Sequence, residues 1–286
     1  MVDIPETQEI VAKAVHAAKA YEIRPDHPFI YVSKIISPDY VDIRLLNGDP
    51  QQRDIVMEET KDIITKLGPS RFFAFCGYVT ADLTFGGILS DWAFKPYFYV
   101  RDSEKGHGAA KRIEGVKPEQ LEGKEVLHIG DLLTRGTTSK KLADVMKETG
   151  ATLKYHVPIF DRLQGGREAL SELGIEVHPA CIMDDSFYQT GIKAGLITEK
   201  DFEEVQSYRA DNTGWATNYL RNNTEFFRRE LQKPGIIENG EIKTPDVLEV
   251  LTVGYPQLKD EFAPYIRGLL KELGVTQPVP DFEYRV

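Results

Sequence analysis

The stretch from Glu125 to Ser139, EVLHIGDLLTRGTTS, constrains the fold of this chain more than any other. Val126, Leu127 and Ile129 form a short apolar run, which predicts a buried parallel strand. A polar loop rich in glycine and threonine follows, and the next residues, 140–149, have the apolar spacing of a helix. Backbone N–H groups and the positive end of the helix dipole meet at such a loop, so the stretch predicts an anion site suited to phosphate.

The sequence around this stretch alternates short apolar runs with amphipathic segments. Strands are predicted in residues 37–47, 71–82, 96–102, 151–162 and 175–183, and helices in 7–21, 51–67, 83–92, 164–174 and 184–207. Such alternation favours right-handed crossovers and a mostly parallel sheet, whose ligand sites lie beyond the carboxyl ends of the strands. Three loops are expected to meet there: residues 77–82, 101–115 and 130–139.

From Tyr208 the pattern changes to helices with no strand between them. Helices are predicted in residues 213–231, 244–251 and 257–273, with a small hairpin that turns at Asn239 and Gly240. We therefore divide the chain into a domain of residues 1–207, which includes an N-terminal helix, and a C-terminal helical extension of residues 208–286. Packing or oligomerisation is the expected role of the extension.

Charge and composition narrow the possible partners. The formal net charge is −10, so the overall field repels nucleic acid and anionic membranes, and neither is expected as a partner. No apolar run approaches the roughly 18 to 20 residues of a membrane span, and the N-terminus lacks the apolar core of a signal peptide, which favours the cytoplasm. Cys76 and Cys181 are too few for a cysteine metal site and are expected to be small buried apolar residues.

The segment RDSEKGHGAAKRIEG, residues 101–115, is polar, basic and glycine-bearing. Arg101, Lys105 and His107 are its main basic side chains toward the N-terminal end. Beside an anion-binding loop in such an acidic chain, this composition suits a lid that closes over phosphate and excludes water. A solvated surface hairpin has the same composition, so composition alone does not separate the two.

Over roughly residues 29–215, these stretches together resemble the type I phosphoribosyltransferases, and among them the orotate phosphoribosyltransferases. Residues 101–115 carry the most specific likeness, because they keep Arg101, Lys105, His107 and the triplet at 113–115 of the family lid. Asp131 matches an acid at the end of the family's phosphate-binding strand. The resemblance implies a type I phosphoribosyltransferase fold, which is an α/β fold with a mostly parallel sheet flanked by helices, here with a C-terminal helical appendage.

The resemblance also implies a reaction, in which phosphoribosyl pyrophosphate (PRPP) and orotate give orotidine 5′-monophosphate and pyrophosphate. The implied catalytic residues are Lys105, His107 and Asp131. The implied PRPP-binding residues are Arg101, Lys105, His107, Asp131, Thr134, Arg135, Gly136, Thr137 and Thr138, and the implied orotate-binding residues are Lys34, Thr134 and Arg162. Mg²⁺ is the implied cofactor and is carried by PRPP rather than held directly by the protein. The implied assembly is a homodimer whose lids complete each other's sites.

Several positions depart from the family pattern. Gly130 stands where a first acid is expected, Asp102 replaces a pyrophosphate-binding lysine, and Asp82 stands where glycine is common. Arg135 replaces a small residue and either adds a charged contact to the 5′-phosphate or fills the pocket as a built-in cation. Two alternatives therefore stay open: a non-catalytic regulatory protein that binds PRPP or a nucleotide, and a phosphoribosyltransferase for another base.

Overall fold

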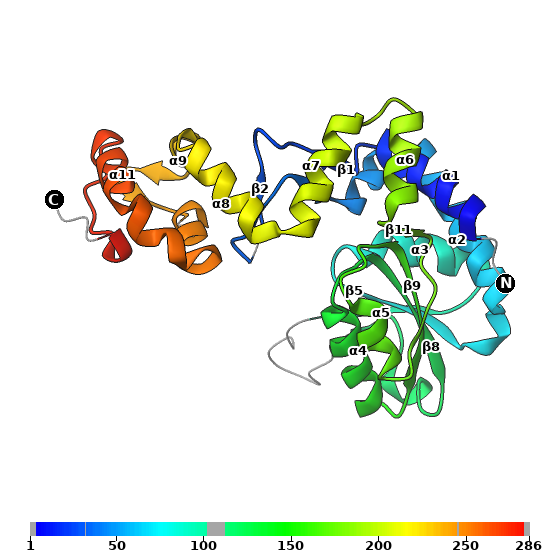
Figure 1. Ribbon diagram of the computed structural model, residues 1–286. Helices are drawn as coiled ribbons and strands as arrows, with labels where there is room; N and C mark the ends of the chain where they lie inside the picture. Colours follow the sequence, from blue (N-terminus) through cyan, green and yellow to red (C-terminus); the bar gives the residue numbers. More distant parts are fainter. Residues whose placement is uncertain (1–3, 32, 102–111, 245, 283–286) are drawn as a thin grey trace. The chain divides into compact units, whose positions relative to one another are not determined.

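A computed structural model describes residues 4–31, 33–101, 112–244 and 246–282 of the chain. The chain forms two compact units (Figure 1). Unit 1 consists of residues 1–21 and 41–197, and unit 2 consists of residues 22–40 and 198–286.

This division differs from the predicted one at residues 207 and 208. Helix α7 (Glu199–Ala210) belongs to unit 2, and so does the N-terminal segment 22–40. The physical reason is burial, because Ile36 is fully buried in the core of unit 2 and its backbone N–H donates a hydrogen bond to Tyr255 Oη at 3.2 Å. A segment that joins a core so distant in the sequence leaves no signal in local periodicity.

Unit 1 is built on a seven-stranded sheet in the order β10-β9-β8-β5-β6-β7, and β11 also pairs with β9. The strands are β5 (Ala74–Tyr78), β6 (Tyr97–Val100), β7 (Ile113–Glu114), β8 (Glu125–Leu133), β9 (Thr152–Asp161), β10 (Glu176–Val177) and β11 (Cys181–Ile182). Only the β6–β7 pair of this sheet is antiparallel in the described ranges. The predicted α/β architecture with a mostly parallel sheet is confirmed.

Helices cover both faces of this sheet (Figure 1). They are α1 (Ile4–Ala17), α2 (Pro50–Leu67), α3 (Asp82–Ala93), α4 (Thr137–Glu148), α5 (Gly166–Ser171) and α6 (Asp185–Lys193). Leu142 and Met146 of α4 and Leu170 of α5 pack with Val126 and Leu153 of the strands in one core. Helix α2 begins one residue before the predicted range, and the Asp49 side chain caps it by accepting a hydrogen bond from Gln52 N at 3.1 Å, with Pro50 in the first turn.

Unit 2 contains α7, α8 (Asn212–Asn222), α9 (Glu225–Leu231), α10 (Asp246–Glu249) and α11 (Lys259–Glu272). Short strands accompany them: β2 (Phe29–Ile30) pairs with β3 (Ile36–Ser37), and β12 (Ile237–Glu238) pairs with β13 (Glu241–Ile242). The predicted hairpin is confirmed, since Asn239 and Gly240 both have positive φ at its turn. In the described ranges, no helix has the length and apolar character needed to cross a membrane.

Three predicted elements are corrected. The strand expected in 37–47 is β4 (Asp39–Val41), which pairs with β1 (Tyr21–Ile23), and residues 43–48 form a 3₁₀ helix. The Asp42 side chain starts that turn by accepting a hydrogen bond from Arg44 N at 3.1 Å. The single helix expected in 213–231 is α8 and α9, because Asn223 leaves helical geometry. The helix expected in 244–251 shortens to α10 and continues as a π-helical turn, Val250–Gly254.

The cysteine prediction is confirmed. Cys76 lies in β5 and Cys181 in β11, and both are buried and not bonded to each other.

Candidate functional site

The carboxyl end of β8 and the loop after it form the candidate site. Strand β8 continues past the predicted apolar run as far as Leu133. Asp131 therefore lies near the end of this strand rather than in the loop. The loop then reaches Gly136, whose φ of 73° precedes the first turn of α4. A small pocket of about 70 Å³ lies here, lined by Asp82, His128, Gly130, Asp131, Leu132, Leu133, Thr134, Gly136, Thr137, Thr138 and Ser139. The structure thus brings five of the predicted PRPP-binding residues around one hollow.

The loop after β9 packs against the loop of residues 134–138, which is predicted to bind phosphate and is called the phosphate loop below. A Cβ on Gly166 would lie 2.5 Å from the carbonyl oxygen of Thr134, so only glycine allows the two loops to approach this closely. Arg162 N donates a hydrogen bond to Leu133 O at 2.9 Å, which places the half-buried Arg162 next to the end of β8. The fully buried Asp161 carboxylate holds the loop by accepting from Leu163 N at 2.9 Å and from Arg167 Nε at 2.5 Å.

Asp82 is the second acid that lines this pocket, besides Asp131, and it comes from the first turn of α3. Asp82 is only 4% exposed, and its carboxylate oxygens accept three hydrogen bonds. Oδ2 accepts from Tyr78 N at 2.7 Å and lies 2.9 Å from His128 Nε2, and Oδ1 accepts from Asp131 N at 3.1 Å. The carboxylate therefore links the ends of β5 and β8 and fixes the backbone of Asp131.

Two stacked histidines occupy the space behind Gly130. The rings of His128 and His156 have centroids 4.4 Å apart and planes 15° apart, and His128 Nδ1 lies 3.2 Å from Ser139 Oγ. A Cβ on Gly130 would lie 2.7 Å from His156 Cε1. Burial lowers the pKa of His156 well below its ordinary value, so this ring is neutral. Position 130, where the family has its first acid, therefore has no room for a side chain beside His156.

The environment of Asp131 raises its pKa from 3.8 to about 6. Burial is the main cause and the nearby Asp82 carboxylate the second, while Arg44 and His128 act in the opposite direction, as does the hydrogen bond from Leu132 N at 2.7 Å. At neutral pH the group is still ionised. It can then accept hydrogen bonds from a ligand's hydroxyl groups.

The Arg135 side chain is exposed and does not line the pocket. Of the two readings left open for this residue, the geometry disfavours the one in which the guanidinium fills the phosphate site. A contact to bound phosphate from the loop's outer side stays a prediction.

The two ends of the segment predicted to form a lid, Arg101 and Arg112, lie at the edge of the sheet. Arg101 N donates to Arg112 O at 2.9 Å, and β6 pairs with β7 just inside this contact, so the two ends of the lid are held together. Arg101 Nη2 lies 3.4 Å from Glu114 Oε1. Lys105, His107 and the departure at Asp102 lie outside the described residues.

Lys34 belongs to unit 2. Its Nζ lies 2.5 Å from Asp246 Oδ1 and 2.8 Å from Glu249 Oε2, and these two carboxylates raise the pKa of the amine. An orotate contact from Lys34 would require both ion pairs to rearrange.

No family model matches the chain. The orotate phosphoribosyltransferase of Rhizobium meliloti (strain 1021) is 30% identical over 211 residues, which is 73% of this chain and 89% of that protein. The chain belongs to the orotate phosphoribosyltransferase family. That membership confirms the resemblance seen in the sequence and places the chain among the phosphoribosyltransferase enzymes.

Two solved structures agree with the fold, and the first is an orotate phosphoribosyltransferase. The enzyme from Aeropyrum pernix superposes with a TM-score of 0.54 at 27% identity, covering 65% of this chain and 98% of its own. UMP synthase from Leishmania donovani gives a TM-score of 0.59 at 22% identity over 70% of this chain, which spans 42% of that longer chain. The expected type I phosphoribosyltransferase fold is confirmed.

Three residues at the site were not predicted from the sequence: Asp82, His128 and His156. The available signal was the departure at Asp82, where glycine is common in the family. The two histidines are 28 residues apart in the sequence and meet only because β8 and β9 pair in parallel, with His128 opposite His156.

Proposed function

We propose that this protein is a cytoplasmic enzyme that transfers the phosphoribosyl group of PRPP to orotate and releases orotidine 5′-monophosphate and pyrophosphate. One observation carries the proposal: Asp131 and the loop Thr134–Thr138 converge on one pocket at the N-terminus of α4. The curated relatives, which are named for orotate, supply the acceptor.

In this reaction the bond between ribose C1′ and a pyrophosphate oxygen breaks, and the leaving pyrophosphate takes the electron pair. A bond from C1′ to N1 of orotate forms, and the N1 proton of orotate passes to the departing pyrophosphate or to water. The backbone N–H groups of the loop and α4 bind the 5′-phosphate, and the Asp131 carboxylate accepts hydrogen bonds from the ribose hydroxyls and so orients C1′. Arg101, together with Lys105 and His107 of the lid, neutralises the charge that develops on pyrophosphate.

We assign Mg²⁺ to the pyrophosphate group of PRPP, where it would neutralise part of the leaving group's charge. In the described ranges, no three His, Cys, Asp or Glu side chains gather into a metal-binding group. The Asp82 oxygens already accept hydrogen bonds from Tyr78 N and Asp131 N.

The decisive assay follows orotate consumption by absorbance after the protein is mixed with PRPP and Mg²⁺. Orotate consumption that requires the protein, PRPP and Mg²⁺ together supports the proposal. PRPP binding in calorimetry without turnover of any base would instead support the regulatory alternative, and turnover with a different base would identify another transferase.

Arg162 is expected to read the orotate carboxylate, because it follows β9 and its backbone N–H is hydrogen-bonded to Leu133 O at the end of β8. Arg162→Ala should raise the KM for orotate by about tenfold or more, the worth of a charge-assisted hydrogen bond, and change the KM for PRPP by about twofold or less. Arg162→Lys keeps the charge but loses the planar guanidinium. Its KM for orotate should lie between those of the wild type and Arg162→Ala. Steady-state kinetics with each substrate varied in turn tests this assignment, which equal rises in both KM values would contradict.

A homodimer with sites shared through the lids is part of the proposal. Mixing Lys105→Ala chains with Asp131→Asn chains should restore up to about a quarter of wild-type activity per site, because random exchange makes hybrid dimers with one intact site. Activity is measured after subunit exchange has been demonstrated by mass spectrometry. No recovery in an exchanged mixture would show that each chain completes its own site.

A further inference from the structure

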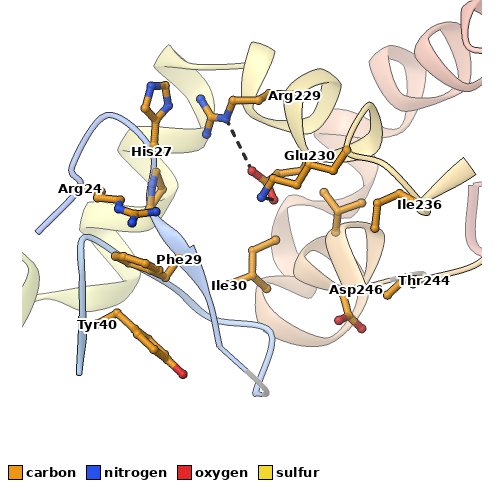
Figure 2. Close-up of a pocket in the computed structure, with 13 residues that line it drawn as sticks. Arg24, His27, Phe29, Ile30, Tyr40, Arg229, Glu230, Ile236, Thr244 and Asp246 are labelled. Atoms are coloured by element: carbon orange, nitrogen blue, oxygen red, sulfur yellow. Dashed lines mark hydrogen bonds and ion pairs between the residues drawn. The ribbon is translucent and has the colours of Figure 1, made fainter. Parts of the chain in front are cut away.

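A pocket of about 530 Å³ lies wholly within unit 2, between the segment that contains β2 and the residues around α9 and α10 (Figure 2). Its size falls in the range of sites for small molecules. No residue of this pocket belongs to the phosphate loop of unit 1. Its occupant therefore has to be identified from its own lining.

One wall of the pocket is aromatic. The rings of Phe29 and Tyr40 stack with centroids 5.1 Å apart and planes 25° apart, and both rings line the cavity. The Arg24 guanidinium lies 4.9 Å from the centre of the Phe29 ring. Figure 2 shows these three side chains layered on one side, with Ile30 facing the interior. Because Arg24 and Tyr40 cover Phe29, the wall offers mainly ring edges to the cavity, and a flat ring of a ligand can pack edge-to-face against them.

The end of the pocket next to this wall is basic. Figure 2 shows Arg24, His27 and Arg229 at one end, and Ile236, Thr244 and Asp246 at the other. The lining carries three permanent cations, Arg24, Arg229 and Lys233, against two carboxylates, Glu230 and Asp246. This local excess of positive charge contrasts with the net charge of −10 of the whole chain.

Both carboxylates already have cationic partners. Glu230 Oε2 lies 2.5 Å from Lys233 Nζ, its Oε1 lies 3.6 Å from Arg229 Nε, and Asp246 pairs with Lys34. Arg24 forms its ion pair with Glu22, outside the lining. Arg229 Nη1 donates a hydrogen bond to Asp26 O at 3.5 Å, and the guanidinium also interacts with Tyr219. The Arg229 side chain lines the pocket and is 35% exposed, so it can also pair with an anionic group of a ligand.

We propose that this pocket is a second binding site, for a small molecule that combines a planar nucleobase-like ring with an anionic group, such as a nucleoside monophosphate. The ring lies along Phe29 and Tyr40, and the anion meets Arg229 and the basic end. The inference is independent of the proposed transfer reaction, because it concerns binding and is tested without turnover.

The test is calorimetric titration of uridine 5′-monophosphate into the full-length protein, compared with uridine, ribose 5-phosphate and orotate. The monophosphate should bind about tenfold or more tightly than uridine or ribose 5-phosphate, since each of these keeps only one of the two recognised groups. Orotate, which joins a ring directly to a carboxylate, distinguishes a carboxylate ligand from a phosphate ligand of the same chemistry. Ribose 5-phosphate or uridine binding as tightly as the monophosphate would overturn the proposal.

Adjacent arginines provide matched variants. Arg229→Ala should weaken binding of the monophosphate by about tenfold or more, whereas Arg228→Ala should change it by about twofold or less. Arg228 does not line the pocket and pairs instead with Glu272 at 2.5 Å and Glu225 at 3.1 Å. Arg229→Lys, which keeps the charge, and a thermal melt of each variant separate loss of binding from loss of folding. Monophosphate binding that survives unchanged in well-folded Arg229→Ala would place the ligand elsewhere, in the phosphate loop, and refute the site.

Discussion

Asp131→Asn is expected to lower kcat/KM for PRPP by about 100-fold or more. The variant keeps the size of the side chain and the backbone contact to Leu132 N but loses the negative charge. Two charge-assisted hydrogen bonds to ribose hydroxyls are each worth about 1.5 to 3 kcal/mol, which together correspond to at least two orders of magnitude in rate. Steady-state kinetics measures the loss, and Asp131→Glu, which keeps the charge in a longer side chain, is the comparison. A loss of less than tenfold would remove Asp131 from the reaction.

The same carboxylate should set the acid side of the pH profile. Since burial and the Asp82 charge raise the pKa of Asp131 to about 6, the carboxylate becomes protonated as the pH falls through that value. The kcat/KM for PRPP should therefore decline below about pH 6 in the wild type. Arg44 and His128 also face this group, so a variant at either position should move the midpoint. A rate that stays flat from pH 7.5 to 5 would contradict this assignment.

Stability should change in the opposite direction from activity. A carboxyl group whose pKa is higher in the folded state than in the unfolded state, here about 6 against 3.8, stabilises the fold fully below pH 4. This stabilisation is lost as the pH rises through 6. Asp131→Asn avoids the cost of the buried charge, so its free energy of unfolding at pH 8 should exceed that of the wild type, by roughly 3 kcal/mol at most. Urea unfolding at pH 8 and pH 4 measures the difference, which should nearly vanish at the lower pH.

Gly130→Glu, which restores the acid of the family pattern, is expected to lower both stability and activity rather than improve catalysis. The added Cβ would lie 2.7 Å from His156 Cε1, inside a stacked and buried histidine pair. Overpacking of this kind costs about 1 to 3 kcal/mol, and the larger Glu side chain must also displace neighbours. Thermal unfolding together with the orotate assay measures both effects.

Smaller variants isolate the cause. Gly130→Ala adds only the clashing Cβ and should already destabilise the protein, whereas Gly87→Ala in α3 meets no atom within 4 Å and should be neutral or stabilising by up to about 1 kcal/mol. If His156 is the obstacle, His156→Ala should make Gly130→Ala less costly than it is alone. Equal costs in both backgrounds would move the cause away from the histidine pair.

The sequence was sufficient to predict the sheet and the Gly–Thr loop between β8 and α4, because both depend on local signals. The apolar run of β8, the Gly–Thr loop and the helix after it are contiguous, and parallel strands must bring their carboxyl ends to one edge. Family likeness added Arg162 and Asp131 at that edge. These features could be predicted because each depends on only a few neighbouring residues.

The parts that could not be predicted depend on strand register and on contacts distant in sequence. His128 and His156 meet through the register of β8 on β9, and Asp82 reaches Asp131 N across 49 positions. The prediction of a strand in 37–47 was wrong because the chain turns after β4, where Arg44 N donates a hydrogen bond to the Asp42 side chain. Periodicity does not encode contacts of either kind.

The two-part construction of unit 2 has a consequence for synthesis on the ribosome. Ile36 is made early, but Phe226, Leu251 and Ile266, which share its core, come about 190 or more residues later. At translation rates of about 5 to 20 residues per second, the apolar segment around β2 and β3 waits roughly 10 s or longer for its partners. Residues 41–197 are translated during that wait. The nascent chain therefore carries an unsatisfied apolar segment near its N-terminus while unit 1 is completed, and the last helices must be released before that segment can be buried.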